Sequence, residues 1–177
     1  MLWRSGHPDR LDDAGWAELG ETGITTVIDL RNEDERSRAG GARGGIRVIH
    51  CPLEAVDDPE YSRRWDRNWA TPDFYAWGRM RWPALWSAAL GAIAEAPGGV
   101  LIHCVGGRDR TGMVTAALLQ TAGVRREYIL GDYVRGIRER SRRDIDGYID
   151  EYRDALNRLL DGLAPERELK RAAARLL

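Results

Sequence analysis

The sequence is poor in cysteine, histidine and long apolar runs, and each shortage excludes a class of protein. Two cysteines, Cys51 and Cys104, exclude a disulfide framework and a zinc site built only from cysteines. Three histidines are too few to predict a metal cluster. The chain has no run of about 18 apolar residues, and its first residues lack the apolar stretch of a signal peptide. We therefore expect a soluble, cytoplasmic protein with no membrane span, no metal and no other cofactor.

Lysine is almost absent as well. Lys170 is the only lysine among 27 basic residues, and the other 26 are arginine. A GC-rich genome produces such a bias, although the arginine fork also suits bidentate binding of anions. The net charge is −1, so the field of the whole chain does not attract nucleic acid or an anionic membrane. Nucleic acid is therefore not an expected partner.

The length and composition predict one globular domain over residues 1–177. Apolar residues make up 43% of the chain and charged residues 31%, which is a globular balance. We find no internal repeat, linker or low-complexity tract.

The pattern of apolar residues predicts strands that alternate with helices. We expect strands over Ile24–Leu30, Ile46–Leu53 and Val100–His103, the last of them buried on both faces. Such alternation predicts an α/β fold with a central, mostly parallel sheet flanked by helices, and ligands bind at the carboxyl ends of parallel strands. Helices are expected over residues 11–21, from Thr71 onward, and over 83–96, 111–122 and 125–137, followed by a helical C-terminal part over 144–177.

One motif combines several features of an anion-binding site. The strand that ends at His103 leads directly into Cys104-Val105-Gly106-Gly107-Arg108-Asp109-Arg110-Thr111-Gly112, and a helix begins at the end of this segment. A short loop between a strand and a helix can turn its backbone N–H groups inward, next to the positive end of the helix dipole. The two glycines permit the tight curl. The segment from Val105 to Arg110 is thus the predicted cradle for a phosphoryl group.

Three side chains of this motif have predicted chemical roles. The inward N–H groups, the helix dipole and Arg110 all favour the thiolate form of Cys104, which is a nucleophile. Arg110 can bind two phosphoryl oxygens through its fork. Thr111 can donate a hydrogen bond to the sulfur and ease its departure from a phosphocysteine. His103 lies on the opposite side of the strand from Cys104, so we expect it to orient the loop and not to transfer protons.

This segment resembles the signature loop of the protein tyrosine phosphatase superfamily. The form with Asp109 before Arg110 resembles that of atypical bacterial tyrosine and lipid phosphatases, which carry G-K-D-R-T-G, and Arg108 stands where they usually have lysine. The resemblance implies two-step, metal-independent hydrolysis through a cysteinyl-phosphate, on phosphotyrosine-containing protein or a phosphoinositide. Family members usually carry a further segment upstream of the first block matched here. The other stretches that carry the resemblance are Trp3-Arg4-Ser5-Gly6, Ile24 to Arg31 with Glu35, Cys51-Pro52-Leu53-Glu54, and Gly131-Asp132-Tyr133.

The general acid has several candidates in the sequence. Asp109 lies inside the predicted cup, where it either protonates the leaving group or positions Arg110. Glu54, Asp57 and Asp58 follow the second strand and are the alternatives, with Asp57 and Asp58 also typical of a solvated turn. Trp82-Pro83-Ala84 resembles the Trp-Pro-Asp loop of many relatives only superficially, because it lacks the acid.

Two further pairings are expected near the motif. Arg31 follows the first strand and is predicted to pair with Glu35. Cys51 and Cys104 each follow a predicted strand, and the ends of parallel strands share one edge at a spacing of about 5 Å, so one prediction is a disulfide between them in mild peroxide. The other prediction is that Cys51 fills the core.

Rival interpretations concern the same loop. A pseudophosphatase would bind phosphorylated partners without turnover, and the uncertain acid keeps this alternative open. A rhodanese or an arsenate reductase also uses a loop cysteine, but the Arg110-Thr111-Gly112 sequence disfavours both.

Overall fold

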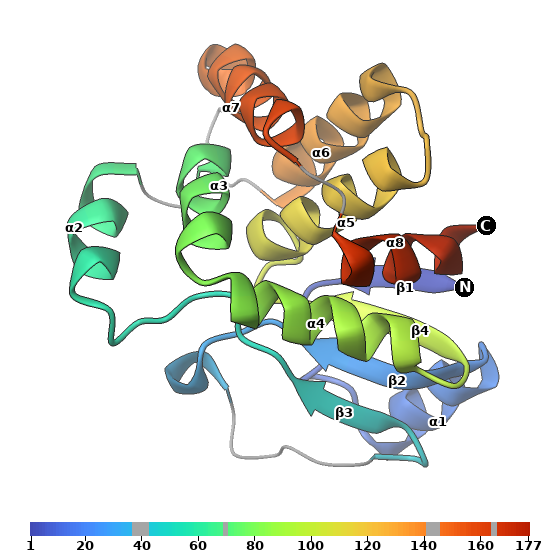
Figure 1. Cartoon of the computed structure of the whole chain (residues 1–177). Coiled ribbons are helices and arrows are strands. Elements are labelled where there is room, and N and C mark those ends of the chain that lie inside the picture. Colours follow the sequence, from blue (N-terminus) through green and yellow to red (C-terminus); the bar gives the residue numbers. More distant parts are fainter. Residues whose placement is uncertain (37–42, 69–70, 141–145, 164–165) are drawn as a thin grey trace.

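The computed structural model describes residues 1–36, 43–68, 71–140, 146–163 and 166–177. Within them, four parallel strands form one sheet in the order β1-β4-β2-β3 (Figure 1). The predicted α/β fold with a parallel sheet is therefore confirmed. The strands are β1 (Leu2–Ser5), β2 (Ile24–Asp29), β3 (Arg47–His50) and β4 (Gly99–His103).

Helices surround this sheet. The α-helices are α1 (Asp13–Glu21), α2 (Pro59–Asn68), α3 (Pro72–Arg81), α4 (Pro83–Glu95), α5 (Asp109–Thr121), α6 (Arg126–Arg140), α7 (Ile149–Asp161) and α8 (Arg167–Ala173). Short 3₁₀ helices are η1 (Glu33–Glu35), η2 (Asp146–Tyr148) and η3 (Ala174–Leu176). The helical C-terminal part predicted from residue 144 contains α7 and α8, and residues 144–145 lie outside the described residues. None of the described helices has the length and apolar character needed to cross a membrane.

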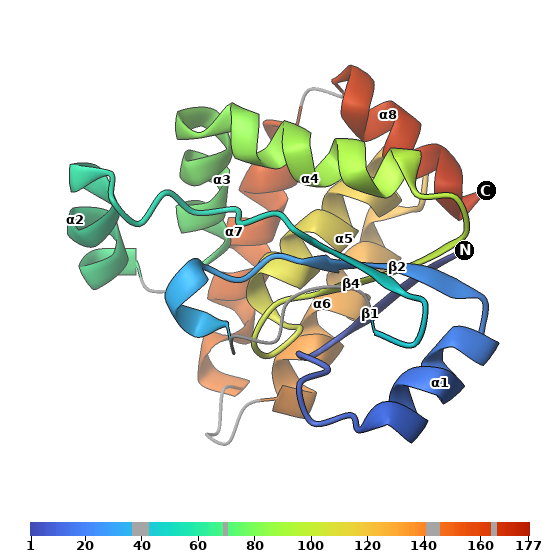
Figure 2. The ribbon, with the colours of Figure 1, turned by 90° about the horizontal axis from the view of Figure 1, so that it is seen from below.

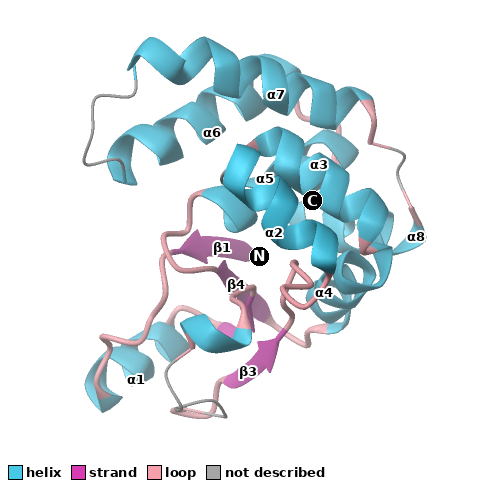
Figure 3. Ribbon diagram, turned by 90° about the vertical axis from the view of Figure 1, so that its left-hand side faces the viewer, coloured by secondary structure: helices cyan, strands magenta, loops and turns pink. Residues whose placement is uncertain are grey.

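The two faces of the sheet are covered unequally. Figure 3 shows α1 on one side of the strands and the helices from α3 to α8 on the other, and in Figure 2, seen from below, the strands run between α1 and α4. The larger core lies under the many helices and includes Ile28, Ile102 and Trp86. A smaller core packs Trp16 of α1 against Val27 and other apolar residues of the sheet. The carboxyl ends of all the parallel strands meet at one edge, where the signature loop begins.

Local signals explain where several helices begin and end. Asp12 caps α1 by accepting a hydrogen bond from the Gly15 amide at 2.9 Å. Thr71 caps α3 in the same way, because its hydroxyl accepts a hydrogen bond from the Phe74 amide at 3.3 Å, and Pro72 occupies the first turn. These features confirm the start predicted at Thr71. Gly23 follows α1 with a φ of +84°, a backbone conformation that glycine adopts without strain.

Two elements escaped prediction. The strand β1 has four residues and begins one residue after the N-terminal methionine, so it offers too short a pattern to recognise. Helix α2 begins at Pro59, inside the stretch that the sequence indicated as an acidic turn, and its residues are mostly polar. Both elements lie next to the site described below, so their omission left the site incomplete.

Candidate active site

The signature loop joins β4 to α5 at the carboxyl edge of the sheet. Cys104 directly follows the last residue of β4 and is only 2% exposed. Helix α5 begins at Asp109, two residues earlier than predicted, so Arg110 and Thr111 belong to its first turn. The unpaired N–H groups of a helix start thus face the same region as the thiol, which favours an anion there.

Gly107 gives the loop its shape. Its φ is +70°, in the left-handed region that favours glycine. A Cβ built on Gly107 would lie 2.2 Å from the carbonyl oxygen of Ser5, at the end of β1. The chain just beyond β1 also binds the loop, because the His7 amide donates to the Val105 carbonyl at 3.1 Å. The loop is therefore held from outside by the segment that follows β1.

Arg110 is held by Glu35, which corrects the predicted pair between Arg31 and Glu35. Nη2 of Arg110 donates to Oε1 of Glu35 at 2.7 Å, and Nη1 donates to Oε2 of the same carboxylate. Burial alone would raise the pKa of Glu35, but the hydrogen bond and charge of Arg110 outweigh it and lower the pKa. Arg31 reaches only the backbone carbonyl of Glu35, at 3.4 Å. Glu35 was therefore recognised in the sequence but assigned to the wrong arginine.

Two buried polar atoms at the loop have no hydrogen-bond partner among the described residues. They are Nε of Arg110 and Oγ1 of Thr111. A buried donor without a partner is uncommon in folded proteins and calls for an explanation such as a ligand site. Nε of Arg110 suits a phosphoryl oxygen, and the hydroxyl of Thr111 suits the role predicted for it beside the Cys104 sulfur.

Asp109 lies inside the loop but pairs with Arg108, not with Arg110. Nε of Arg108 donates to the two carboxylate oxygens at 2.9 and 3.0 Å. Burial raises the pKa of Asp109 above its ordinary value, although the charge of Arg108 opposes this shift. The alternative that Asp109 serves to position Arg110 is therefore not supported. A half-buried carboxyl with a raised pKa is suited to carry a proton.

The other predicted acids differ sharply from one another. Glu54 is buried next to the site, 3.7 Å from Nη1 of Arg110, and accepts hydrogen bonds from Asn32 at 2.6 Å and Tyr61 at 3.3 Å. Asp57 is exposed on the turn before α2.

Asp58 has a structural role that argues against proton donation. Its carboxylate accepts hydrogen bonds from Nε of Arg81 and Nε1 of Trp82, each at 2.9 Å. The bond from Trp82, followed by that from Arg81, lowers the pKa of Asp58 to about 2. The two hydrogen bonds and the lowered pKa favour the charged carboxylate, so Asp58 is less suited than Asp109 to donate a proton.

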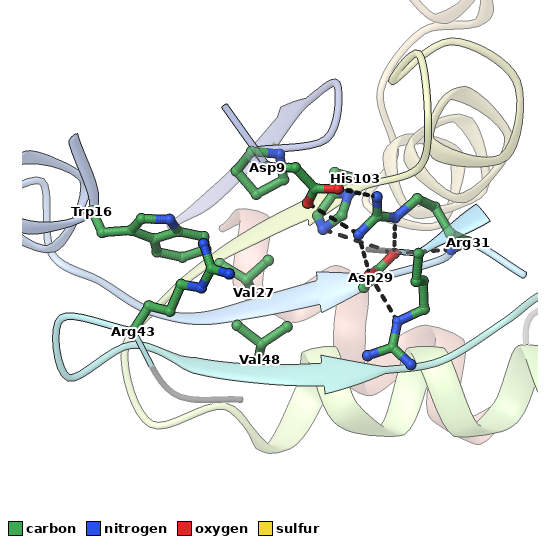
Figure 4. Close-up of a pocket in the computed structure, with 10 residues that line it drawn as sticks. Asp9, Trp16, Val27, Asp29, Arg31, Arg43, Val48 and His103 are labelled. Carbon is green, nitrogen blue, oxygen red and sulfur yellow. Dashed lines mark hydrogen bonds and ion pairs between the residues drawn. The ribbon is translucent and has the colours of Figure 1, made fainter. Parts of the chain in front are cut away.

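A charged network supports the loop from the α1 side of the sheet (Figure 4). Arg31 donates to both oxygens of Asp29, at 2.9 and 2.8 Å, and to both oxygens of Asp9, at 2.7 and 3.2 Å. Nε2 of His103 lies 3.8 Å from Asp29, and its Nδ1 lies 3.1 Å from the carbonyl oxygen of Cys104. Burial lowers the pKa of His103 despite the charge of Asp29. The orienting role predicted for His103 fits this arrangement.

The sheet order contradicts the idea that Cys51 and Cys104 follow adjacent strands. β2 lies between β3 and β4, so Leu30 separates the two cysteines across the sheet. Both thiols are free. Burial, with a contribution from Asp29, raises the pKa of Cys51 to about 11. Cys51 therefore fills the core, which was the other prediction for it.

Two tyrosines near the site were missed in the sequence. Tyr61 on α2 donates its hydroxyl to Glu54. Tyr75 on α3 is buried, and burial together with the negative charges of Glu54 and Asp109 raises its pKa. No spacing in the sequence links these tyrosines to the loop, because their helices reach it only in the folded chain. Among the described residues, no three His, Cys, Asp or Glu side chains are grouped as a metal site requires.

Comparisons with known proteins agree with this geometry. The triple specificity protein phosphatase PtpB of Mycobacterium tuberculosis is 32% identical over 167 residues, covering 76% of this chain and 60% of the relative. A tyrosine-protein phosphatase of Nostoc commune is 27% identical over 135 residues, covering 73% of this chain and 46% of the relative. The chain thus spans about half to three fifths of the length of these relatives.

A solved structure shares the fold. The core catalytic domain of the PP-IP phosphatase SIW14 from S. cerevisiae, in complex with citrate, matches with a TM-score of 0.51 and 18% identity. The match covers 90% of this chain and 86% of that one. A model described as the tyrosine phosphatase family matches residues 1–172. The chain therefore belongs to the tyrosine phosphatase family.

Proposed function

We propose that the protein hydrolyses phosphomonoesters without a metal ion, through a cysteinyl-phosphate on Cys104. The observation that carries the proposal is the convergence of the buried thiol, the fork of Arg110 and the start of α5 in one loop. In the first step, the Cys104 thiolate attacks phosphorus, an S–P bond forms and the P–O bond to the leaving group breaks. In the second step, water attacks phosphorus, the S–P bond breaks and the thiolate is restored.

The other groups of the loop have separate roles in this reaction. The backbone amides from Val105 to Arg110 bind the phosphoryl oxygens, and Arg110 stabilises the charge that spreads over them in the transition state. Asp109 protonates the leaving oxygen and takes a proton back from the attacking water. Thr111 donates to the sulfur as the thiolate departs. Glu54 remains the alternative acid, because it is buried 3.7 Å from Arg110.

The substrate is a phosphotyrosine-containing protein or a phosphoinositide. The name of the PtpB relative as a triple specificity protein phosphatase supports phosphoprotein substrates, and that of the SIW14 neighbour as a PP-IP phosphatase supports inositol phosphates. Both kinds of substrate present a phosphoryl group that the loop can bind in the same way.

Hydrolysis of p-nitrophenyl phosphate, with and without EDTA, tests this function. The parent protein should hydrolyse p-nitrophenyl phosphate at the same rate with and without EDTA. Cys104→Ser should lose this activity while keeping its fold and its affinity for inorganic phosphate. Arg110→Ala should lose both turnover and phosphate binding. Substantial turnover by the purified Cys104→Ser variant would contradict the mechanism, and phosphate binding by an inactive parent would favour a pseudophosphatase.

A further inference from the structure

A groove of about 710 Å³ lies beside the signature loop, between β1 and α1. Its floor is aliphatic, because Leu19, Ile24 and Leu101 all line it. Trp3 of β1 and Val105 of the loop also line it, and these two apolar side chains are 46% and 42% exposed. The groove is thus an exposed apolar surface in a size range that suits a ligand.

The groove reaches β1, the edge strand of the sheet. Three consecutive residues of this strand, Trp3, Arg4 and Ser5, line it. Leu101 of β4 and Ile24 of β2 line it as well, so the groove lies on the α1 face of the sheet and extends to the edge strand. In the described sheet β1 pairs only with β4, so its other edge has no strand partner. Such an edge can bind the main chain of an extended peptide.

The groove borders the proposed catalytic loop at Val105. Val105 directly follows Cys104, and it both belongs to the loop and lines the groove. The hydrogen bond from His7 to the Val105 carbonyl joins the two at their boundary. A chain that presents a phosphorylated residue to Cys104 can therefore continue over Val105 into the groove.

The rim of the groove carries one arginine without an ion-pair partner among the described residues. Arg4, His7 and Arg10 line the groove, whereas no aspartate or glutamate of the described residues does. Arg4 pairs with Asp132 at 3.0 Å and His7 lies 3.5 Å from Asp9, so the exposed Arg10 supplies the free positive charge. An aliphatic floor with a basic rim complements a segment that carries apolar and acidic side chains. A phosphoinositide in a bilayer keeps its acyl chains in the membrane and presents only its polar head group, so it offers no apolar group to such a floor.

We propose that this groove binds the polypeptide that flanks the phosphorylated residue of a protein substrate, with an apolar side chain against Trp3 and an acidic one beside Arg10. This inference rests on the proposed function and selects phosphoprotein over phosphoinositide as the substrate class. The peptide adds along the edge of β1, and its phosphorylated residue enters the loop.

Kinetics with matched substrates test the groove. The substrates are p-nitrophenyl phosphate, a phosphotyrosine peptide with apolar and acidic flanks, and the same peptide with lysine in place of the acidic residues. For the acidic peptide, Trp3→Ala and Arg10→Glu should each lower kcat/KM about tenfold, as the loss of one well-packed interface contact does. For p-nitrophenyl phosphate, both variants should have the same kcat/KM as the parent. Arg10→Glu should have a higher kcat/KM for the lysine peptide than for the acidic peptide.

Control variants and alternative outcomes keep the test decisive. Tyr128→Ala and Arg125→Glu change exposed residues around α6 and should leave all substrates unaffected. The inference is overturned if the groove variants leave kcat/KM for the acidic peptide unchanged or lower kcat/KM equally for all substrates. It is also overturned if they lower the hydrolysis of phosphoinositide in vesicles and not that of the peptide. If the parent fails on p-nitrophenyl phosphate, the proposed function fails on its own. Peptide binding to Cys104→Ser, followed by fluorescence anisotropy, then still tests the groove.

Discussion

The cation at the centre of the proposed site is neutralised by a residue far away in sequence. Glu35 binds the two terminal nitrogens of Arg110 across a separation of 75 residues. The carboxylate fixes the orientation of the guanidinium, while Nε stays without a partner among the described residues. Glu35 is thus a positioning residue that acts through Arg110.

Replacing Glu35 with glutamine should weaken the site more than the fold. The amide keeps the shape of the carboxylate but places an N–H group against the guanidinium, so Arg110 loses its fixed orientation. We expect kcat/KM for p-nitrophenyl phosphate to fall about 10- to 100-fold, because small displacements of positioned groups have effects of this size. The affinity for inorganic phosphate should fall as well, which can be measured by competitive inhibition. Glu33→Gln is the matched control, since the Glu33 side chain is 80% exposed and should leave both values unchanged.

The raised pKa of Asp109 leads to a prediction on pH. An acid catalyst must hold its proton, so turnover of a substrate with a poor leaving group should fall as the pH rises through the pKa of Asp109. Asp109→Asn should remove this limb of the profile and slow a poor leaving group more than a good one, which needs no proton. Profiles of kcat for an alkyl and a nitrophenyl phosphate measure the difference. If Asp109→Asn slows both substrates equally while Glu54→Gln shows the leaving-group effect, Glu54 is the acid.

At the scale of elements, the signature loop depends on the end of β1. The loop packs so closely on the carbonyl of Ser5 that no side chain fits at Gly107. Gly107→Ala should lower the free energy of unfolding by at least about 1–2 kcal/mol, the cost of a left-handed alanine, and abolish phosphate binding because the loop must move. Gly106→Ala is the control, since its Cβ would meet only Arg108, at 4.0 Å. Chemical denaturation together with phosphate inhibition distinguishes the two variants, and equal behaviour would contradict this account of the loop.

For the whole molecule, the sequence predicted local features better than spatial neighbours. The loop from Cys104 to Arg110 and the helix starts at Thr71 and Pro83 could be predicted, because each depends on residues close together in the chain. The partner of Arg110 could not, since Glu35 reaches it only when β2 and β4 lie side by side. The strand order was likewise hidden, because nothing in the sequence indicates that β2 separates β3 from β4.

That strand order predicts how the protein responds to oxidation. Neighbouring strands are about 4.8 Å apart, so Cys51 and Cys104, with Leu30 between them, are separated by about 10 Å. A disulfide requires Cα atoms within about 7 Å, and the raised pKa of Cys51, about 11, keeps this group a thiol near neutral pH. Cys51→Ser should therefore lose activity in mild peroxide at the same rate as the parent and recover to the same extent in dithiothreitol. Recovery that disappears only in Cys51→Ser would show that the two cysteines meet, and would require the strands at this edge to separate.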